Sequence, residues 1–262
     1  MGIKDSKRTK VMPICKLCLQ EKELCESHII PKFVYRPVND EKRREVVVSE
    51  NKYSIVQNGV KIPLLCKECE GKFSNYEMEL KWFLKDLQEK NSDHFKEMPQ
   101  SKGRIYVVEN YDFNKIHKAI ISIFWRLSQV TEDCPFAKIY LGPYEEKFRK
   151  ICLEDTEIEW TRYPIYVEKL VWEKEFFDQV IMNYKNMGRV DKVSHRKMIL
   201  YGTVFHLFLA EDLSKFSKNF ESVFLGGPYS PIILSDFNDV IAQSQNLLNS
   251  ERMGGVVKLL GK

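Results

Sequence analysis

The sequence predicts an α+β protein with a zinc-stabilised N-terminal module over residues 13–90 and a larger α+β domain over residues 104–262. Two Cys-x-x-Cys pairs predict the module, because paired thiols at this spacing are typical of structural zinc sites. The polar stretch 91–103 contains a proline and a glycine and is predicted to separate the two units. Residues 1–12, rich in lysine, are predicted to form a flexible basic tail.

The two cysteine pairs are the most informative motif of the chain. A Cys-x-x-Cys turn directs two thiolates at one point, and two such turns complete a tetrahedral Zn²⁺ site that leaves no water on the metal. We therefore expect a structural rather than a catalytic zinc ion. Its predicted ligands are Cys15, Cys18, Cys66 and Cys69. Cys25 is an alternative ligand, although it follows Cys18 at a less suitable spacing.

Composition and charge exclude several classes of protein. The net charge of +4 over 262 residues excludes a global polycation. The N-terminal residues lack the apolar run of a signal peptide, and no apolar run is long enough to span a membrane. Seven cysteines, four of them in the predicted metal site, give no even disulfide framework. We expect a cytoplasmic protein with free thiols at Cys25, Cys134 and Cys152.

Three segments of the N-terminal module have patterns of regular structure. The β-branched residues at 44–49 predict a strand, and residues 52–63 predict a hairpin that turns at Asn58-Gly59. After the second cysteine pair, apolar residues recur at helical spacing, which predicts a helix from about residue 70 to residue 90. These apolar residues are Phe73, Tyr76, Leu80 and Phe83.

The second unit mixes both periodicities. The strongest signal is an amphipathic helix at 114–130, whose apolar stripe and Trp125 predict that most of it is buried. A shorter helix is predicted at 143–153, where a proline opens the first turn and two glutamates follow near its positive end. Strands are predicted at 104–109, 163–172 and 230–234, a strand or a helix at 197–209, and a helix at 238–249.

The first third of the chain has the layout of a ββα-metal unit, in which a histidine on the first strand faces a helix that follows a hairpin. His28 lies after the first cysteine pair, and the second pair leads into the predicted helix. Over roughly residues 13–80 the chain resembles the HNH endonuclease family, most specifically in Ser27-His28-Ile29-Ile30-Pro31 and Leu65-Cys66-Lys67-Glu68-Cys69-Glu70. The remainder resembles bacterial proteins with the same module, through residues 122–126 and 141–147, and implies no further activity.

The resemblance implies roles for individual residues. His28 would be the general base that removes a proton from water. Glu70 stands where the family has a histidine or asparagine, and its carboxylate can bind Mg²⁺ or Mn²⁺ through oxygen. Glu77, two helical turns later, could share this catalytic cation.

The chain departs from the family pattern at two further positions, which leaves other interpretations open. Ser27 replaces an acidic residue, and the middle asparagine would fall near Lys61, with Asn58 three positions earlier. His28 could instead support the zinc site or pack in the core. Glu70 could simply favour the helix N-terminus, and Glu77 could belong to a solvated face.

Together these patterns predict an endonuclease that hydrolyses phosphodiester bonds of DNA with a divalent cation. The alternative is a non-catalytic zinc module that binds nucleic acid or protein. A protein partner or a second copy could bind through the C-terminal domain. The basic residues predicted to contact nucleic acid are Lys32, Lys61, Lys72, Arg196 and Lys197.

Overall fold

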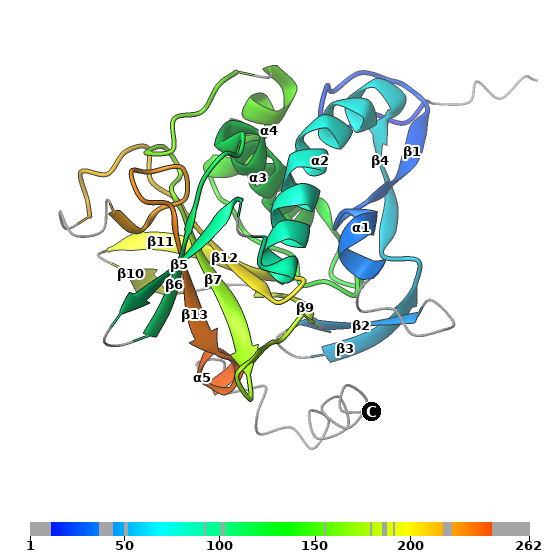
Figure 1. Ribbon diagram of the computed structural model, residues 1–262. Coiled ribbons are helices and arrows are strands. Elements are labelled where there is room, and N and C mark those ends of the chain that lie inside the picture. Colours follow the sequence, from blue (N-terminus) through cyan, green and yellow to red (C-terminus); the bar gives the residue numbers. More distant parts are fainter. Residues whose placement is uncertain are drawn as a thin grey trace, which may run out of the picture.

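A large mixed sheet, a two-stranded sheet and a group of helices make up the fold, as expected for an α+β protein (Figure 1). The computed structural model describes residues 12–36, 44–49, 52–91, 93–100, 103–154, 156–178, 180–184, 188–190, 192–216 and 222–242. The predicted basic tail therefore lies outside the described residues except at Met12. Most of the helix predicted at 238–249 also lies outside them; its first part belongs to α5 (Phe237–Ala242).

The small sheet contains the predicted first strand. Strand β1 (Leu24–His28) pairs antiparallel with β4 (Lys61–Cys66), and His28 lies opposite Lys61. The long helix α2 (Lys67–Glu89) follows β4 without a loop, while the short helix α1 (Lys32–Tyr35) follows β1. Two antiparallel strands thus lie next to a helix that begins where the second strand ends.

The prediction of a hairpin at 52–63 is wrong. Strand β3 (Lys52–Gln57) pairs with β2 (Arg44–Ser49) in the large sheet, whereas β4 pairs with β1 in the small one. Asn58 and Gly59 lie between β3 and β4 with φ angles of 60° and 78°, so their left-handed backbone redirects the chain from one sheet to the other. A Cβ atom on Gly59 would lie 2.6 Å from the ring of Tyr35.

The large sheet has eleven strands, of which nine follow the order β3-β2-β9-β11-β12-β7-β13-β6-β5, while β10 pairs with β11 and β8 with β7. Only the β2–β9 and β7–β13 pairs are parallel. The remaining strands are β5 (Phe95–Gln100), β6 (Gly103–Val108), β7 (Ile165–Trp172), β8 (Glu175–Phe176), β9 (Ile181–Asn183), β10 (Arg189–Val190), β11 (Val193–Leu200), β12 (Thr203–Phe208) and β13 (Pro231–Asp236).

The structure decides the conformation of two segments, 91–103 and 197–209. The polar stretch 91–103, expected as a linker, contains β5, which forms an antiparallel hairpin with β6 at one end of the sheet. The segment 197–209 consists of strands, as one of the two predictions states. It is divided by a tight turn at Tyr201-Gly202, where both φ angles are positive.

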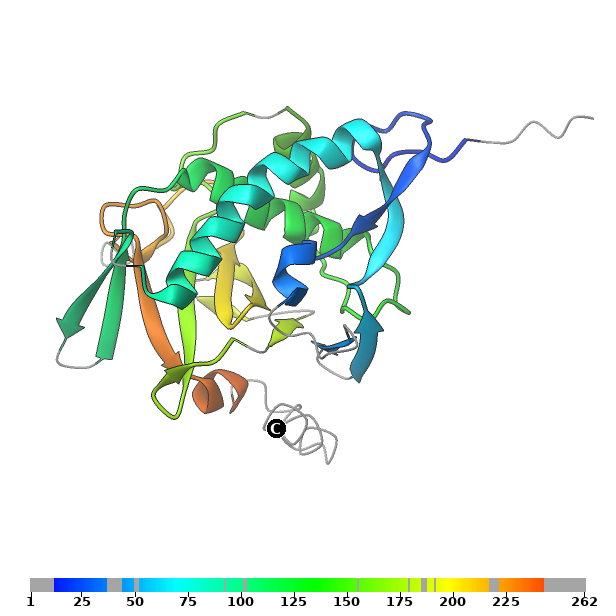
Figure 2. The ribbon, with the colours of Figure 1, turned by 45° about the vertical axis from the view of Figure 1, so that its right-hand side comes forward.

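Helices α2, α3 (Phe113–Gln129) and α4 (Tyr144–Glu154) lie together on one side of the large sheet (Figures 1 and 2). The predicted burial of α3 is confirmed, because every residue from Ile116 to Ser128 is buried. The Asp112 side chain caps α3 by accepting a hydrogen bond from the backbone N–H of Lys115 at 3.1 Å. No described helix is both long and apolar enough to cross a membrane.

A single apolar core runs through both predicted units. It includes Cys15 and Leu65 of the small-sheet region, Phe73 of α2, Ile120 of α3 and Val167 of the large sheet. Strand β2, from the N-terminal unit, also pairs with β9 of the larger unit. Independent folding of residues 104–262 stays a prediction, and it would require exposing the apolar face that α2 covers and the edge of β9 that pairs with β2.

Candidate metal centre and adjoining histidine site

Four thiols converge where the small sheet meets helix α2. The Sγ atoms of Cys15, Cys18, Cys66 and Cys69 all lie within 4.8 Å of one another, and those of Cys18 and Cys66 are 4.0 Å apart. A tetrahedral zinc ion with Zn–S bonds of about 2.3 Å places its sulfur ligands about 3.8 Å apart. The donor set and its dimensions therefore fit a structural metal ion such as zinc.

The local backbone explains how each cysteine pair points inward. Around the first pair, Ile14 and Glu21 form a β-bridge, and Leu19 takes a φ of 60° that closes the turn. The second pair straddles a strand–helix junction, since Cys66 ends β4 and caps α2 while Cys69 lies in the first helical turn. The Arg149 guanidinium on α4 also donates a hydrogen bond to the carbonyl of Leu17, between the first two cysteines.

Backbone hydrogen bonds favour the thiolate form of Cys15, which is the form that binds a metal ion. The N–H of Cys66 donates to the Cys15 sulfur at 3.3 Å. Burial raises the pKa of the Cys15 thiol, but N–H groups of Cys18, Cys66 and Leu17 outweigh burial and lower this pKa to about 7. Burial raises the pKa of Cys66 to about 11. A bound metal ion would deprotonate these thiols, because only the thiolate is a ligand.

Ser27 and Glu70 connect the first strand to the first turn of α2. Ser27 is fully buried, and its hydroxyl donates to Oε2 of Glu70 at 2.7 Å while accepting the N–H of Leu65 at 3.3 Å. The positive end of the α2 dipole also favours the Glu70 carboxylate. Glu70 therefore faces the first strand, as the sequence predicts.

His28 ends strand β1 and is held by the turn that redirects the chain. Its Nε2 lies 3.3 Å from the carbonyl oxygen of Asn58, so a neutral ring that donates from Nε2 leaves Nδ1 as the acceptor. Burial lowers the pKa of His28, and the positive charges of Lys61 and Lys32 lower it further, against the Asn58 hydrogen bond and the charge of Glu70. The lowered pKa favours the neutral imidazole, which is the form able to accept a proton.

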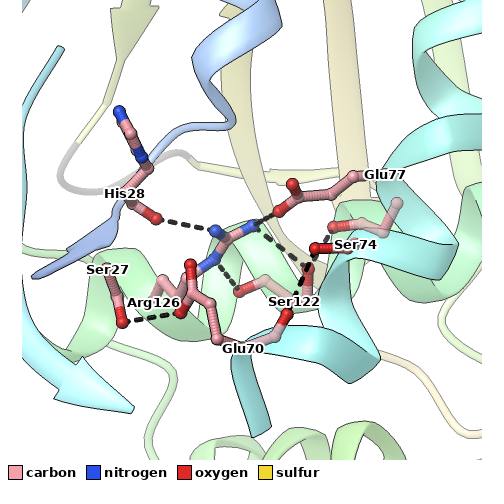
Figure 3. A network of polar contacts seen from close by, with 8 residues as sticks. Ser27, His28, Glu70, Ser74, Glu77, Ser122 and Arg126 are labelled. Carbon is pink, nitrogen blue, oxygen red and sulfur yellow. Dashed lines mark hydrogen bonds and ion pairs between the residues drawn. The ribbon is translucent and has the colours of Figure 1, made fainter. Parts of the chain in front are cut away.

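Arg126 of α3 reaches into this site from the larger unit (Figure 3). Its side chain is buried; Nη1 donates to the main-chain carbonyl of His28 at 2.7 Å, and Nη2 donates to Oε1 of Glu77 at 2.6 Å. Nε donates to the carbonyl of Ser122 at 3.4 Å, and the guanidinium lies 5.1 Å from the centre of the Phe73 ring. The arginine thus ties β1, α2 and α3 together.

This contact changes the interpretation of Glu77. Burial raises the pKa of the Glu77 carboxyl, and the ion pair with Arg126 opposes that rise. The carboxylate neutralises a buried guanidinium, so we leave Glu77 out of the proposed cation site. Sequence analysis missed Arg126, although a charged residue inside the apolar stripe of 114–130 is a signal that could have identified it.

The five predicted phosphate-binding residues do not form one group. Lys32 and Lys61 are exposed, and the positive charge of each lowers the pKa of His28. The other three make contacts within the protein. The ammonium of Lys72 donates to the carbonyl of Leu153 at 2.5 Å, and Arg196 donates to the carbonyl of Tyr140 through Nε at 2.9 Å. Lys197 is only 1% exposed, with its ammonium 5.0 Å from the Tyr184 ring centre, and we leave it out of the proposed nucleic-acid surface.

Comparison of this chain with family models, with curated proteins and with solved structures found no match. The resemblance to HNH endonucleases therefore depends on the motif residues themselves. The geometry of those residues, rather than a relative, is the basis for a proposed function.

Loss of one ligand is expected to release the metal. Cys66→Ser should abolish bound zinc and expose residues 13–90 to protease, because a structural zinc ion supplies much of the folding free energy of its module. Cys25→Ser is the matched control and should keep one zinc ion per chain. Elemental analysis and limited proteolysis measure both effects. Full protection of a metal-free wild-type protein would contradict this expectation.

Replacing Arg126 is expected to destabilise the whole protein. Arg126→Met leaves the Glu77 carboxyl buried without its partner, and breaking a buried ion pair in this way costs about 3–5 kcal/mol. The double variant Arg126→Met/Glu77→Met should recover part of this loss. Urea unfolding of the wild type, both single variants and the double variant measures the coupling. Strictly additive losses would show that the two side chains do not stabilise each other.

Proposed function

We propose that this protein is an HNH-like, metal-dependent endonuclease that hydrolyses phosphodiester bonds of DNA. The observation that carries the proposal is His28 at the end of β1, directly after Ser27, whose hydroxyl binds the Glu70 carboxylate in the first turn of α2. The imidazole itself points away from this carboxylate (Figure 3). Exposed Lys32 and Lys61 flank the histidine and can attract a phosphate. The thiol cluster, whose Cys69 directly precedes Glu70, would hold a structural zinc ion.

The arrangement supports a simple chemical role for each residue. His28 would accept a proton from water at Nδ1, while the Asn58 carbonyl fixes the tautomer and orients the ring. Glu70 would hold Mg²⁺ or Mn²⁺ through a carboxylate oxygen, with Ser27 fixing the orientation of that carboxylate. When bound, such an ion polarises the scissile phosphate and stabilises the leaving 3′ oxygen.

One observation favours a second candidate function. Of the two carboxylates predicted to hold a catalytic cation, Glu77 binds Arg126 and Glu70 already accepts a hydrogen bond from Ser27. A single carboxylate is a sparse site for Mg²⁺, although this ion often keeps several waters. A non-catalytic zinc module that binds nucleic acid or protein is therefore the alternative.

Nicking of supercoiled plasmid with Mg²⁺, Mn²⁺ or EDTA distinguishes the two functions. His28→Ala should retain zinc but lose at least about a hundredfold in cleavage rate, the lower range for an acid–base group. Glu70→Gln should raise the Mn²⁺ concentration needed for half-maximal rate. His94→Ala, which alters a histidine whose ring centre lies 4.8 Å from that of Tyr111, is the matched control and should cleave normally. Undiminished cleavage by His28→Ala would show that His28 is structural, and plasmid binding without cleavage by any form would favour the alternative.

The pH dependence of cleavage should follow His28. A general base works only when neutral, so the rate should fall as the pH drops through its pKa, and burial together with Lys61 lowers the pKa of His28 from its usual value. Lys61→Met removes a neighbouring positive charge, which should raise the pKa and move the acid limb of the rate profile to higher pH. Lys150→Met, on α4, should leave the limb in place. An acid limb that does not move, or that moves to lower pH, argues against His28 as the base.

A further inference from the structure

Helix α2 presents an exposed tryptophan between two lysines. The Trp82 side chain is 44% exposed, and its ring centre lies 5.2 Å from Nζ of Lys81 and 5.4 Å from Nζ of Lys85. Met78, one turn earlier, is 52% exposed. Tryptophan is normally among the more buried side chains, and cations at this distance over the ring are attracted to its π face. We call these four residues the Trp82 patch.

The patch lies on a different flank of α2 from Glu70. Trp82 follows Glu70 by 12 residues, which is three helical turns plus about 120°, so the two side chains leave the helix in different directions. At a rise of 1.5 Å per residue they lie about 18 Å apart along the axis. The flank of Glu70 itself is covered further along the helix, where Glu77 pairs with Arg126. The patch would therefore contact the substrate separately from the cleavage point.

We infer that the Trp82 patch binds an unpaired stretch of nucleic acid, with one base stacked on Trp82 and phosphates on Lys81 and Lys85. This inference rests on the proposed endonuclease function and specifies its substrate class. Base stacking on an exposed ring requires a base that is free of its complement, whereas a fully paired duplex offers only its edges and backbone. The substrate would therefore carry a single-stranded segment.

The charges of the patch agree with a strand of phosphates rather than an apolar partner. Lysines are depleted at the centres of protein interfaces, and only two apolar side chains are exposed here. Lys85 pairs with Glu89 at 3.6 Å, but both side chains are at least half exposed, and an ion pair of this kind contributes little free energy. A phosphate can therefore replace Glu89 as the partner of Lys85.

Fluorescence anisotropy with labelled oligonucleotides tests the inference on the full-length, zinc-loaded His28→Ala protein without added Mg²⁺ or Mn²⁺. Trp82→Ala should weaken binding of a single-stranded 20-mer about five- to hundredfold, the range for one stacked base, and Trp82→Phe should restore most of the loss. The variant Lys81→Gln/Lys85→Gln should reduce the slope of log K against log salt by about 1.4. Tyr140→Ala, which removes another exposed aromatic ring, should bind as the parent protein does.

A blunt duplex of the same length separates stacking from simple charge. Equal losses for duplex and single strand, or no loss in Trp82→Ala, would overturn the inference, as would a change in oligomeric state as the sole effect of Trp82→Ala. The proposed function fails separately. If the wild type cleaves and Trp82→Ala binds as tightly as its parent, only the role of the Trp82 patch is refuted. If binding depends on Trp82 and no form cleaves, only the proposed endonuclease function is refuted.

Discussion

The convergence of four thiols is the constraint on which the rest of the site depends. Cys15 and Cys18 lie in the turn closed by the bridge between Ile14 and Glu21, whereas Cys66 and Cys69 lie at the start of α2. The four sulfur atoms lie within 4.8 Å of one another. Because β4 runs directly into α2, this convergence also fixes the first helical turn against β1. Glu70 is brought to Ser27 in this way, and His28 is placed at the end of the same strand.

Arginine contacts extend this constraint into the larger part of the molecule. Arg126 of α3 holds the His28 carbonyl and Glu77, and Arg149 of α4 holds the carbonyl of Leu17 beside the thiols. Arg126 is buried, and a buried guanidinium is costly unless it is paired, so its contacts favour one arrangement of β1, α2 and α3 over others. The helices of the larger unit thus position the small sheet, and the site is not the property of residues 13–90 alone.

Local chemistry could be predicted from the sequence, and long-range pairing could not. The spacing of the cysteine pairs predicts the thiol cluster, and the apolar stripe of α3 predicts its burial. Asn58-Gly59 has the residues of a tight hairpin turn, but its left-handed backbone serves to change sheets, since alternation along a strand does not say which partner it takes. Arg126 meets His28 across 98 positions, a contact that no local pattern encodes. Lys197 lies in a basic run yet is buried, because alternate residues of β11 face opposite sides of the sheet.

In the proposed function two metal ions would have separate tasks: a structural zinc ion held by four thiolates, and a catalytic cation held by Glu70. The zinc ion is the central claim, because the position of Glu70 and His28 follows from it. Zinc K-edge X-ray absorption of the purified protein tests it most directly. A single shell of four sulfur atoms at about 2.3 Å from the metal is expected. A shell that contains nitrogen or oxygen ligands, or a folded protein without bound zinc, would contradict it.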